Sequence, residues 1–268
     1  MKTQLLLSTV LLTAPVLAAQ SLPATTPRTI TINSASTFTV PSGVSTIVVE
    51  GWGGGGGGAY TGGGGGGGYF RIVLSVTAGA TLTLSPGAGG TAGASGSFGG
   101  EGGSTTMTYK SGSTTIDCTA VGGVGSQYFV VTPGANTYFC TGPSVGGYPL
   151  AYTGKPGQYG DPSHTIAIGP RSATSYTAAV TGGDGGDAGN APRTGGQGNH
   201  QTYAYLINPN AASGISPSID QVQANVSNEM SQARAGLLPG GGGGGTASVA
   251  DPTLPAGAGA AGLILVTY

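Results

Sequence analysis

The sequence has little charge of either sign. It holds 8 Lys and Arg residues and 9 Asp and Glu residues, and its formal net charge is −1. Charged residues make up 6% of the chain, against about 25% in ordinary soluble domains. No run of Lys or Arg is present to neutralise phosphates or anionic lipids. This excludes nucleic-acid binding by a basic surface and membrane attachment by a polybasic segment.

Long apolar runs are also missing, so no segment is predicted to span a membrane. A short apolar stretch near the N-terminus is broken by Pro15 and ends in the small residues that a signal peptidase accepts. We expect cleavage after Ala18, with Ala19 as the alternative. Residues 1–18 are therefore predicted to be a signal peptide, and residues 19–268 a single secreted domain.

Cysteine is scarce, and the two that are present suit the compartment predicted above. Cys118 and Cys140 are expected to form a disulfide, because secreted proteins fold under oxidising conditions. A loop of this length stabilises a fold by about 3 kcal/mol. Two cysteines and two scattered histidines lack the spacing of zinc ligands. Asn225 begins the one N-glycosylation sequon, Asn-Val-Ser, which predicts a surface position for it.

No catalytic constellation stands out. Asp161, His164 and His200 lack the Gly-x-Ser-x-Gly turn that positions a nucleophile, and the nine acidic residues are scattered along the chain. The segment Gly182–Asn190 approaches the nonapeptide of calcium-binding β-rolls, but one copy lacks the second turn that completes coordination. We interpret its acids as polar groups in a glycine-rich turn. We predict no enzymatic activity, cofactor or metal.

Glycine is what the sequence has in excess, with 56 residues. Between the glycine runs, several short segments alternate polar and apolar residues, as half-buried strands do. The predicted strands are residues 29–32, 37–40, 44–50, 69–76, 81–84 and 263–266. The strand over 44–50 is apolar at both sets of alternate positions, so we expect it to be buried on both sides.

The glycine runs, chiefly 53–58, 62–68, 87–103, 182–198 and 240–245, are expected to be ordered. Without side chains, neighbouring backbones can approach closely as extended polyproline-II-like helices and exchange hydrogen bonds. The chain as a whole has no Gly-X-Y period, which excludes collagen. The alternative is a small β core with disordered glycine loops. The predicted fold class is mainly β, a compact domain with packed glycine-rich segments.

Two regions depart from this pattern. Residues 104–178 have less glycine and hold both cysteines, and they resemble an elaboration of the domain with short strands. A single short helix is predicted over 217–235, because Pro217 follows a capping Ser216 and apolar residues recur at spacings of three and four.

Tyrosine offers the remaining candidates for recognition, since exposed aromatic rings stack on sugars and partner surfaces. Tyr60 lies between two glycine runs, and three more tyrosines lie in the middle region: Tyr128, Tyr138 and Tyr148. These four are candidate ligand contacts. The alternative, equally supported by sequence, is that they fill the core of a chain short in aliphatic residues.

Three parts of the sequence together resemble a recurrent glycine-rich domain of phage tail-fibre and adhesin proteins and of secreted bacterial and fungal proteins. They are Phe38–Val44 leading to Trp52 and Gly53–Gly58, then Gly62–Gly90 with its two strands, and the closing Gly257–Tyr268. The resemblance implies terminal strands that close a β unit around packed glycine runs, and it implies no enzymatic activity.

These observations predict a secreted, non-enzymatic, glycine-rich protein that is a structural or surface-associated component of the extracellular matrix or cell wall. The alternative is a secreted binding or adhesion module that recognises glycans or cell surfaces through tyrosine-rich loops. The partner is not predicted beyond cell-wall or surface glycans.

Overall fold

The computed structural model describes the chain in segments. These are residues 26–59, 62–94, 97–127, 138–143, 151–155, 157–158, 160, 164–168, 175–181, 183–196, 200–206, 233–246 and 255–268. Predicted features that lie outside them are the signal peptide, Asn225, Tyr60, Tyr128, Tyr148 and nearly all of the helix over 217–235. The last residues of that range, 233–235, are described and belong to an extended segment, not to a helix.

The described residues form two five-stranded antiparallel sheets. The first sheet has the order β1 (Thr29–Ile32), β13 (Leu263–Thr267), β3 (Thr46–Trp52), β4 (Tyr69–Ser75) and β9 (Tyr152–Lys155). The second has the order β2 (Ser36–Thr39), β5 (Thr81–Ser85), β6 (Thr105–Ser111), β7 (Thr114–Ala120) and β8 (Tyr138–Thr141). All six strands predicted from alternation are present.

The two sheets pack face to face as a β-sandwich with one hydrophobic core. Alternate residues of each strand point inward, as the period of two requires. The buried core residues include Ile47, Val49, Phe70, Ile72 and Leu74 of the first sheet and Leu82, Leu84, Met107, Tyr109 and Ile116 of the second. The expectation that β3 is buried on both sides is wrong. Its outward residue Thr46 is exposed and Val48 is only half-buried, because nothing in the described chain covers that end of the sheet.

The region 104–178 supplies β6, β7 and β8 to the second sheet, so its first part lies within the sandwich. Cys118 of β7 and Cys140 of β8 are directly opposite each other, with 4.0 Å between their Cα atoms, and form the expected disulfide. Both are buried in the core. The disulfide therefore attaches the edge strand β8 to the sheet.

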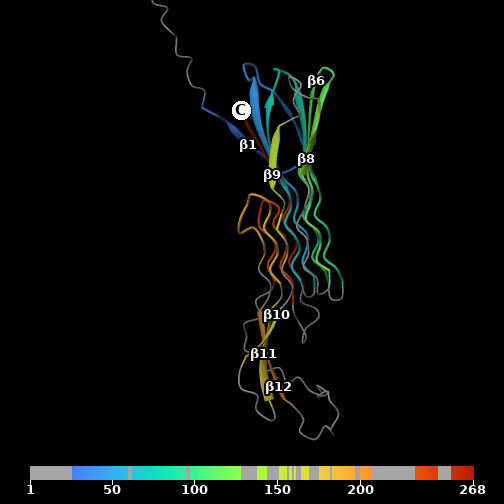
Figure 1. Ribbon diagram of the computed structural model, residues 1–268, viewed down its shortest axis with the longest axis vertical. Coiled ribbons are helices and arrows are strands. Elements are labelled where there is room, and N and C mark those ends of the chain that lie inside the picture. Colours follow the sequence, from blue (N-terminus) through green and yellow to red (C-terminus); the bar gives the residue numbers. More distant parts are fainter. Residues whose placement is uncertain are drawn as a thin grey trace, which may run out of the picture.

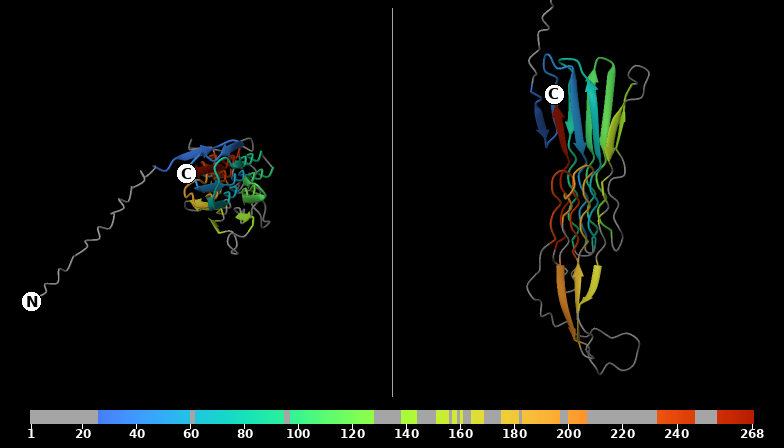
Figure 2. Two further views of the ribbon diagram at one scale, coloured as in Figure 1. Left: turned by 90° about the horizontal axis from the view of Figure 1, so that it is seen from above. Right: turned by 60° about the vertical axis from the view of Figure 1, so that its left-hand side comes forward.

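Beyond one end of the sandwich, the strands continue into an array of extended glycine segments that run side by side, which we call the glycine bundle (Figures 1 and 2). Its central segment, residues 53–59, follows β3 directly. Successive backbone N–H groups of this segment donate hydrogen bonds to three different neighbouring segments, and every third N–H group donates to the same one. Three residues per turn is the geometry of polyproline II. The described parts of the glycine runs are therefore ordered, as predicted.

Six segments surround the central one. Its N–H groups donate hydrogen bonds to three antiparallel neighbours, residues 62–68, 100–103 and 257–260. Its carbonyl groups accept hydrogen bonds from three parallel neighbours, residues 90–93, 123–126 and 243–246. The N···O distances lie between 2.7 and 3.0 Å. A Cβ added to any of Gly53–Gly58 would collide with the backbone of a neighbour. In this interior, backbone hydrogen bonds take the place of side-chain packing.

In the outer segment 97–104, the large side chains face outward. Phe98, Glu101 and Ser104 are exposed at every third position, with two glycines between each. Thr105 joins bundle and sandwich: its buried Oγ1 donates to the Trp52 carbonyl at 2.5 Å and accepts from the Gly87 N–H at 2.8 Å. The spacing of the glycines in this segment thus indicates which side of it is enclosed.

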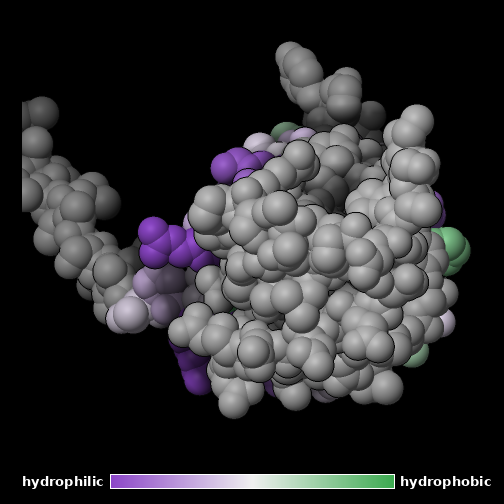
Figure 3. Space-filling view, turned by 90° about the horizontal axis from the view of Figure 1, so that it is seen from below, coloured by the Kyte–Doolittle hydropathy of each residue, from purple (hydrophilic) through white to green (hydrophobic). Residues whose placement is uncertain are grey.

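A third sheet, β10 (His164–Ile168), β11 (Ser175–Thr181) and β12 (His200–Leu206), is antiparallel and lies at the end of the bundle far from the sandwich (Figure 1). From that end, the coloured residues form only small separate groups around the rim, both hydrophilic and hydrophobic (Figure 3). The described part of the chain contains no helix that is long and apolar enough to cross a membrane.

Candidate functional site

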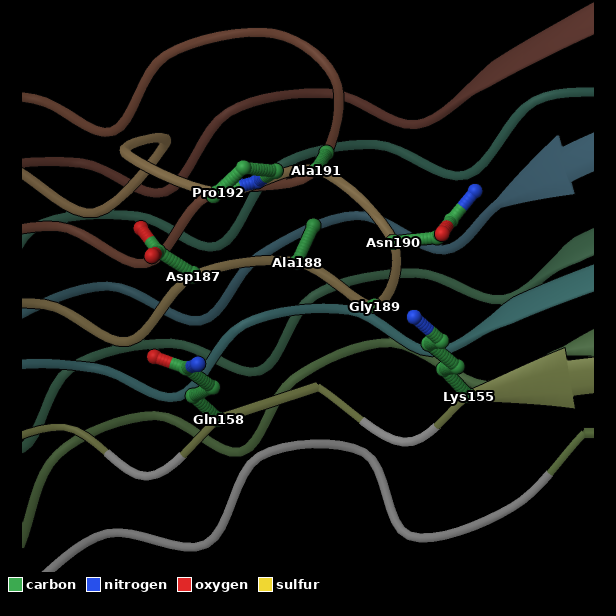
Figure 4. A pocket seen from close by; sticks show the side chains of 8 residues that line it. All are labelled: Lys155, Gln158, Asp187, Ala188, Gly189, Asn190, Ala191 and Pro192. Carbon is green, nitrogen blue, oxygen red and sulfur yellow. The ribbon is translucent and has the colours of Figure 1, made fainter.

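A groove of about 410 Å³ lies where the first sheet meets the glycine bundle. One wall is the end of β9 and the segment after it, which present Lys155 and Gln158. The other wall is the segment 187–192 (Figure 4). Lys155 and Gln158 extend toward the backbone of the segment 187–192, whereas the side chains of Asp187 and Asn190 point away from them (Figure 4). Four polar side chains therefore project from two neighbouring segments, with small residues between them.

The spacing of these side chains follows from the bundle geometry. Lys155 and Gln158 are three residues apart, and so are Asp187 and Asn190. In a helix of three residues per turn, such residues lie on the same side. Gly157 lies between Lys155 and Gln158, and Gly189 lies between Asp187 and Asn190; both glycines are buried. However, Asn190 lies at a left-handed turn, and its side chain points in a different direction from that of Asp187 (Figure 4).

The two walls are fixed to each other through the backbone. The Gln158 N–H donates to the Asp187 carbonyl at 2.7 Å. At Gly189 the walls touch, since an added Cβ would collide with the Lys155 carbonyl oxygen and would lie 3.0 Å from the Tyr69 Cβ. The width of the groove is therefore set by main-chain contacts and not by its flexible side chains.

The loop that follows Asp187 is held by its own hydrogen bonds. Asp187 Oδ1 accepts from the Gly195 N–H at 2.8 Å. Thr194 Oγ1 accepts from the Ala188 N–H at 2.8 Å and donates to the Ala191 carbonyl at 2.9 Å. Two non-glycine residues adopt left-handed backbone angles, Asn190 at φ 58° and Arg193 at φ 64°. Such angles persist only where the surroundings enforce them, so this wall is preorganised.

An aromatic pair lies beneath the loop, on the outer face of the first sheet. The Trp52 and Tyr69 rings have centroids 5.0 Å apart and are 7% and 4% exposed. Ala188 and Ala191 pack over them. The Trp52 Nε1 is buried and makes no hydrogen bond with the described chain. The groove thus has an aromatic layer under its alanine floor.

The Tyr69 hydroxyl is held neutral. It donates to Glu50 Oε1 at 2.5 Å. Burial first, and then the hydrogen bond to the Glu50 carboxylate and its charge, raise the pKa of Tyr69 well above its ordinary value. An interaction with the Asn190 side chain opposes this in part. Asn190 therefore connects the groove to the aromatic pair below it.

A second surface of uniform chemistry is the outer face of the second sheet. Nine threonines face outward along its strands: Thr37, Thr39, Thr81, Thr83, Thr106, Thr108, Thr115, Thr119 and Thr141. The strand register aligns them in rows, with Thr37 opposite Thr83 and Thr83 opposite Thr108. Thr108 Oγ1 donates to Asp117 Oδ1 at 2.5 Å. This face presents hydroxyl and methyl groups with few charges.

Of the four candidate tyrosines, Tyr138 is the one that the structure describes. It begins β8, is half-buried and packs against the core. Its ring meets Tyr152 of β9 edge-on, with centroids 6.3 Å apart, and covers Gly154, where a Cβ would collide with the ring. Tyr138 thus lies at the seam between β8 and β9, and its described contacts are within the molecule.

Sequence reasoning did not find the groove residues. Asp187 and Asn190 lie in the segment that resembles a calcium-binding nonapeptide, but Lys155 and Gln158 are distant in sequence. No group of three or more His, Cys, Asp or Glu that could hold a metal ion occurs in the described ranges. The three-residue spacing was the available signal, and it indicates which side chains face outward, not which segments are neighbours.

The sequence profile of a family described as a glycine-rich domain matches residues 30–268. This match covers the sandwich strands, the glycine bundle and the middle region alike. The chain matches no curated protein.

Proposed function

The chain belongs to the glycine-rich domain family, and we propose that it is a secreted, non-enzymatic protein that serves as a structural or surface-associated component of the extracellular matrix or cell wall. The observation that carries the proposal is the glycine bundle. Its interior consists of backbone hydrogen bonds between closely packed extended segments. Such an array is stiff along its length, and most of its residues serve to pack the backbone. Both properties suit a structural element.

The disulfide supports an extracellular location. Cys118 and Cys140 are paired and buried, and such bonds persist in oxidising compartments and are rare in the cytosol. The N-terminal segment 1–18 has the pattern of a signal peptide. Both features point the same way, one from the folded domain and one from the sequence before it.

Cell fractionation tests this proposal. The full chain, with its own N-terminus, is expressed in a walled secreting host and assayed in the cytosol, medium and washed wall fractions. We expect it in the wall fraction, released by detergent or by wall-degrading enzymes. Retention in the cytosol would contradict secretion, and recovery of all the protein in the medium would contradict surface association. A variant that lacks residues 2–18 is the control for export.

A second candidate function is a binding or adhesion module for glycans or cell surfaces. The groove and the threonine face favour it, because hydroxyls, amides and a carboxylate are the groups that exchange hydrogen bonds with sugars. Co-sedimentation with washed insoluble polysaccharides separates the two functions. A binding module is retained on a particular polysaccharide and released by its soluble oligosaccharides, whereas a purely structural component shows no such preference.

A further inference from the structure

We propose that the groove between Lys155 and Gln158 on one side and residues 187–192 on the other binds one hexose unit of an uncharged polysaccharide. This inference rests on the proposed function, since it names the chemistry by which the protein associates with a wall or matrix. The cavity of about 410 Å³ falls in the usual range for small-ligand sites, about 300–1,000 Å³. It is open along one side, as a site for a unit within a longer chain must be.

The polar groups match the hydroxyls of a sugar. A hydroxyl both donates and accepts a hydrogen bond, so its partners must do both. Gln158 and Asn190 each carry an amide that donates and accepts, Asp187 accepts, and Lys155 donates. A purely anionic ligand would meet the Asp187 carboxylate, and a purely cationic one would meet Lys155. The described lining is balanced in charge, which favours a neutral ligand.

The site is built before the ligand arrives. The Asp187 carboxylate is oriented by the Gly195 N–H, and the backbone contacts at Gln158 and Gly189 hold the walls together. Fixing the receptor in advance lowers the entropy that binding must overcome. The small residues Ala188 and Ala191 give a shallow apolar floor for the carbon-hydrogen face of a sugar ring.

The protein carries its own reporter of this site. Trp52 is the single tryptophan of the chain and lies directly beneath Ala188 and Ala191. A ligand in the groove changes the electric field at the indole of Trp52 and displaces water from the loop above it. Binding is therefore expected to change the tryptophan fluorescence of the folded protein in a saturable way.

The experiment titrates the intact oxidised protein with neutral disaccharides: cellobiose, laminaribiose, mannobiose and chitobiose. Di-galacturonate and diglucosamine are the charged comparisons. We expect at least one neutral disaccharide to give saturable fluorescence and calorimetric signals at millimolar concentration, and the charged ones to bind more weakly. If no neutral disaccharide saturates the signal, or if a charged one binds best, the inference is wrong.

Matched variants assign the binding to the groove. Lys155→Ala and Gln158→Ala each remove one exposed side chain, and each is expected to raise the Kd about tenfold, equal to about 1.4 kcal/mol. Lys110→Ala and Gln127→Ala make the same changes at exposed positions away from the groove and are expected to leave the Kd unchanged. Equal Kd values in all four variants would overturn the assignment. Thermal melts verify that each variant is folded.

Failure of the inference and failure of the proposed function give different results. If the wild type stays in the wall fraction but its disaccharide binding is absent or insensitive to Lys155→Ala, the groove assignment is wrong and surface association stands. If disaccharide binding depends on the groove but the protein does not associate with walls or matrix, the groove stands and the proposed function is wrong.

Discussion

The glycine bundle predicts that one added methyl group at its centre is severely destabilising. Gly57 lies in the central segment, is buried and has neighbours on all sides. A Cβ at this position would lie 2.6 Å from the carbonyl carbon of Thr91, and closer still to its oxygen, whereas real Cβ contacts are essentially never under 3.0 Å. Both obstructing atoms are backbone, so no rotamer change can relieve the collision.

The cost follows from the hydrogen bonds that flank the collision. To make room, the segment that contains Thr91 must move outward, and this breaks the bonds from Gly90 N–H to Gly55 O and from Gly93 N–H to Gly58 O, both 2.8 Å. These breaks leave the buried carbonyl oxygens of Gly55 and Gly58 in the central segment unpaired, and each such group costs about 1–3 kcal/mol. Two such losses give about 4 kcal/mol, a large share of the roughly 5–15 kcal/mol that stabilises a typical domain.

The assay is thermal unfolding of Gly57→Ala, followed by circular dichroism and by Trp52 fluorescence. For a chain of this size, about 4 kcal/mol corresponds to a fall in Tm of roughly 8–16 °C. Two controls isolate the cause. Gly112→Ala adds a Cβ that meets nothing within 4 Å and bears only the left-handed strain of its φ of 57°, about 1–2 kcal/mol. Glu101→Ala alters an exposed outward position, with an expected change within about 0.5 kcal/mol. If the Gly57→Ala variant had the same Tm as the Glu101→Ala variant, the packed-backbone reasoning would be refuted.

Three further predictions follow from particular contacts. The double variant Cys118→Ala with Cys140→Ala should lose about 3 kcal/mol in denaturant titrations, and a stability equal to that of the wild type would show that the disulfide contributes nothing. Thr105→Val keeps the shape but leaves a buried N–H and a buried carbonyl unpaired, so calorimetry should show a loss of about 2–4 kcal/mol; a neutral result would mean that these groups find other partners. Tyr69 has a raised pKa when folded and ionises from about pH 10 when unfolded, so its contribution is complete below pH 10 and is lost as pH rises above it. The stability advantage of the wild type over Tyr69→Phe should therefore shrink above pH 10 in melts at stepped pH, and an advantage that grows there would contradict the assignment.

The strands of the sandwich were predictable because their signal is local. In Thr81–Ser85 the leucines alternate with polar residues, and the structure buries Leu82 and Leu84 while Thr81 and Thr83 stay exposed. A period of two with one enclosed face leaves this pattern in the sequence. The failure at β3 has the same origin. Apolar residues at both sets of positions indicate two protected faces, but Val48 faces outward and is only half-buried.

The sequence predicts that the glycine runs are ordered and not disordered, but it does not predict how they are arranged in space. Clustered strand-length apolar segments and low net charge argued against disorder, and the structure agrees. The three-residue period is present within single segments, as at Glu101 and at Asp184 and Asp187. It does not extend along the chain, because each turn between segments resets which side faces the centre of the bundle. A search for one continuous Gly-X-Y repeat therefore finds nothing.

The groove was beyond sequence reasoning for a further physical reason. Lys155 and Asp187 become neighbours only because their segments lie side by side in the bundle. Glycine segments carry no side-chain pattern on their packed faces, so nothing in their sequence states which segment pairs with which, or in what register. The same absence of side chains that permits close packing removes the information that would identify the partners.

That information comes from the sandwich, whose strand registers continue into the bundle. Trp52 of β3 is opposite Tyr69 of β4, and the pairing continues unbroken as Gly53 with Gly68 and Gly56 with Gly65. The β5–β6, β13–β3 and β4–β9 pairs continue in the same way. Side chains in the sandwich thus select the register, and the glycine backbones extend it to neighbours that a sheet could not reach. The groove lies on such a continuation, since the Gly66 N–H donates to the Gln158 carbonyl in the register of β4 with β9. The sheet therefore positions the polar residues of the groove, although it contributes only Lys155 to them.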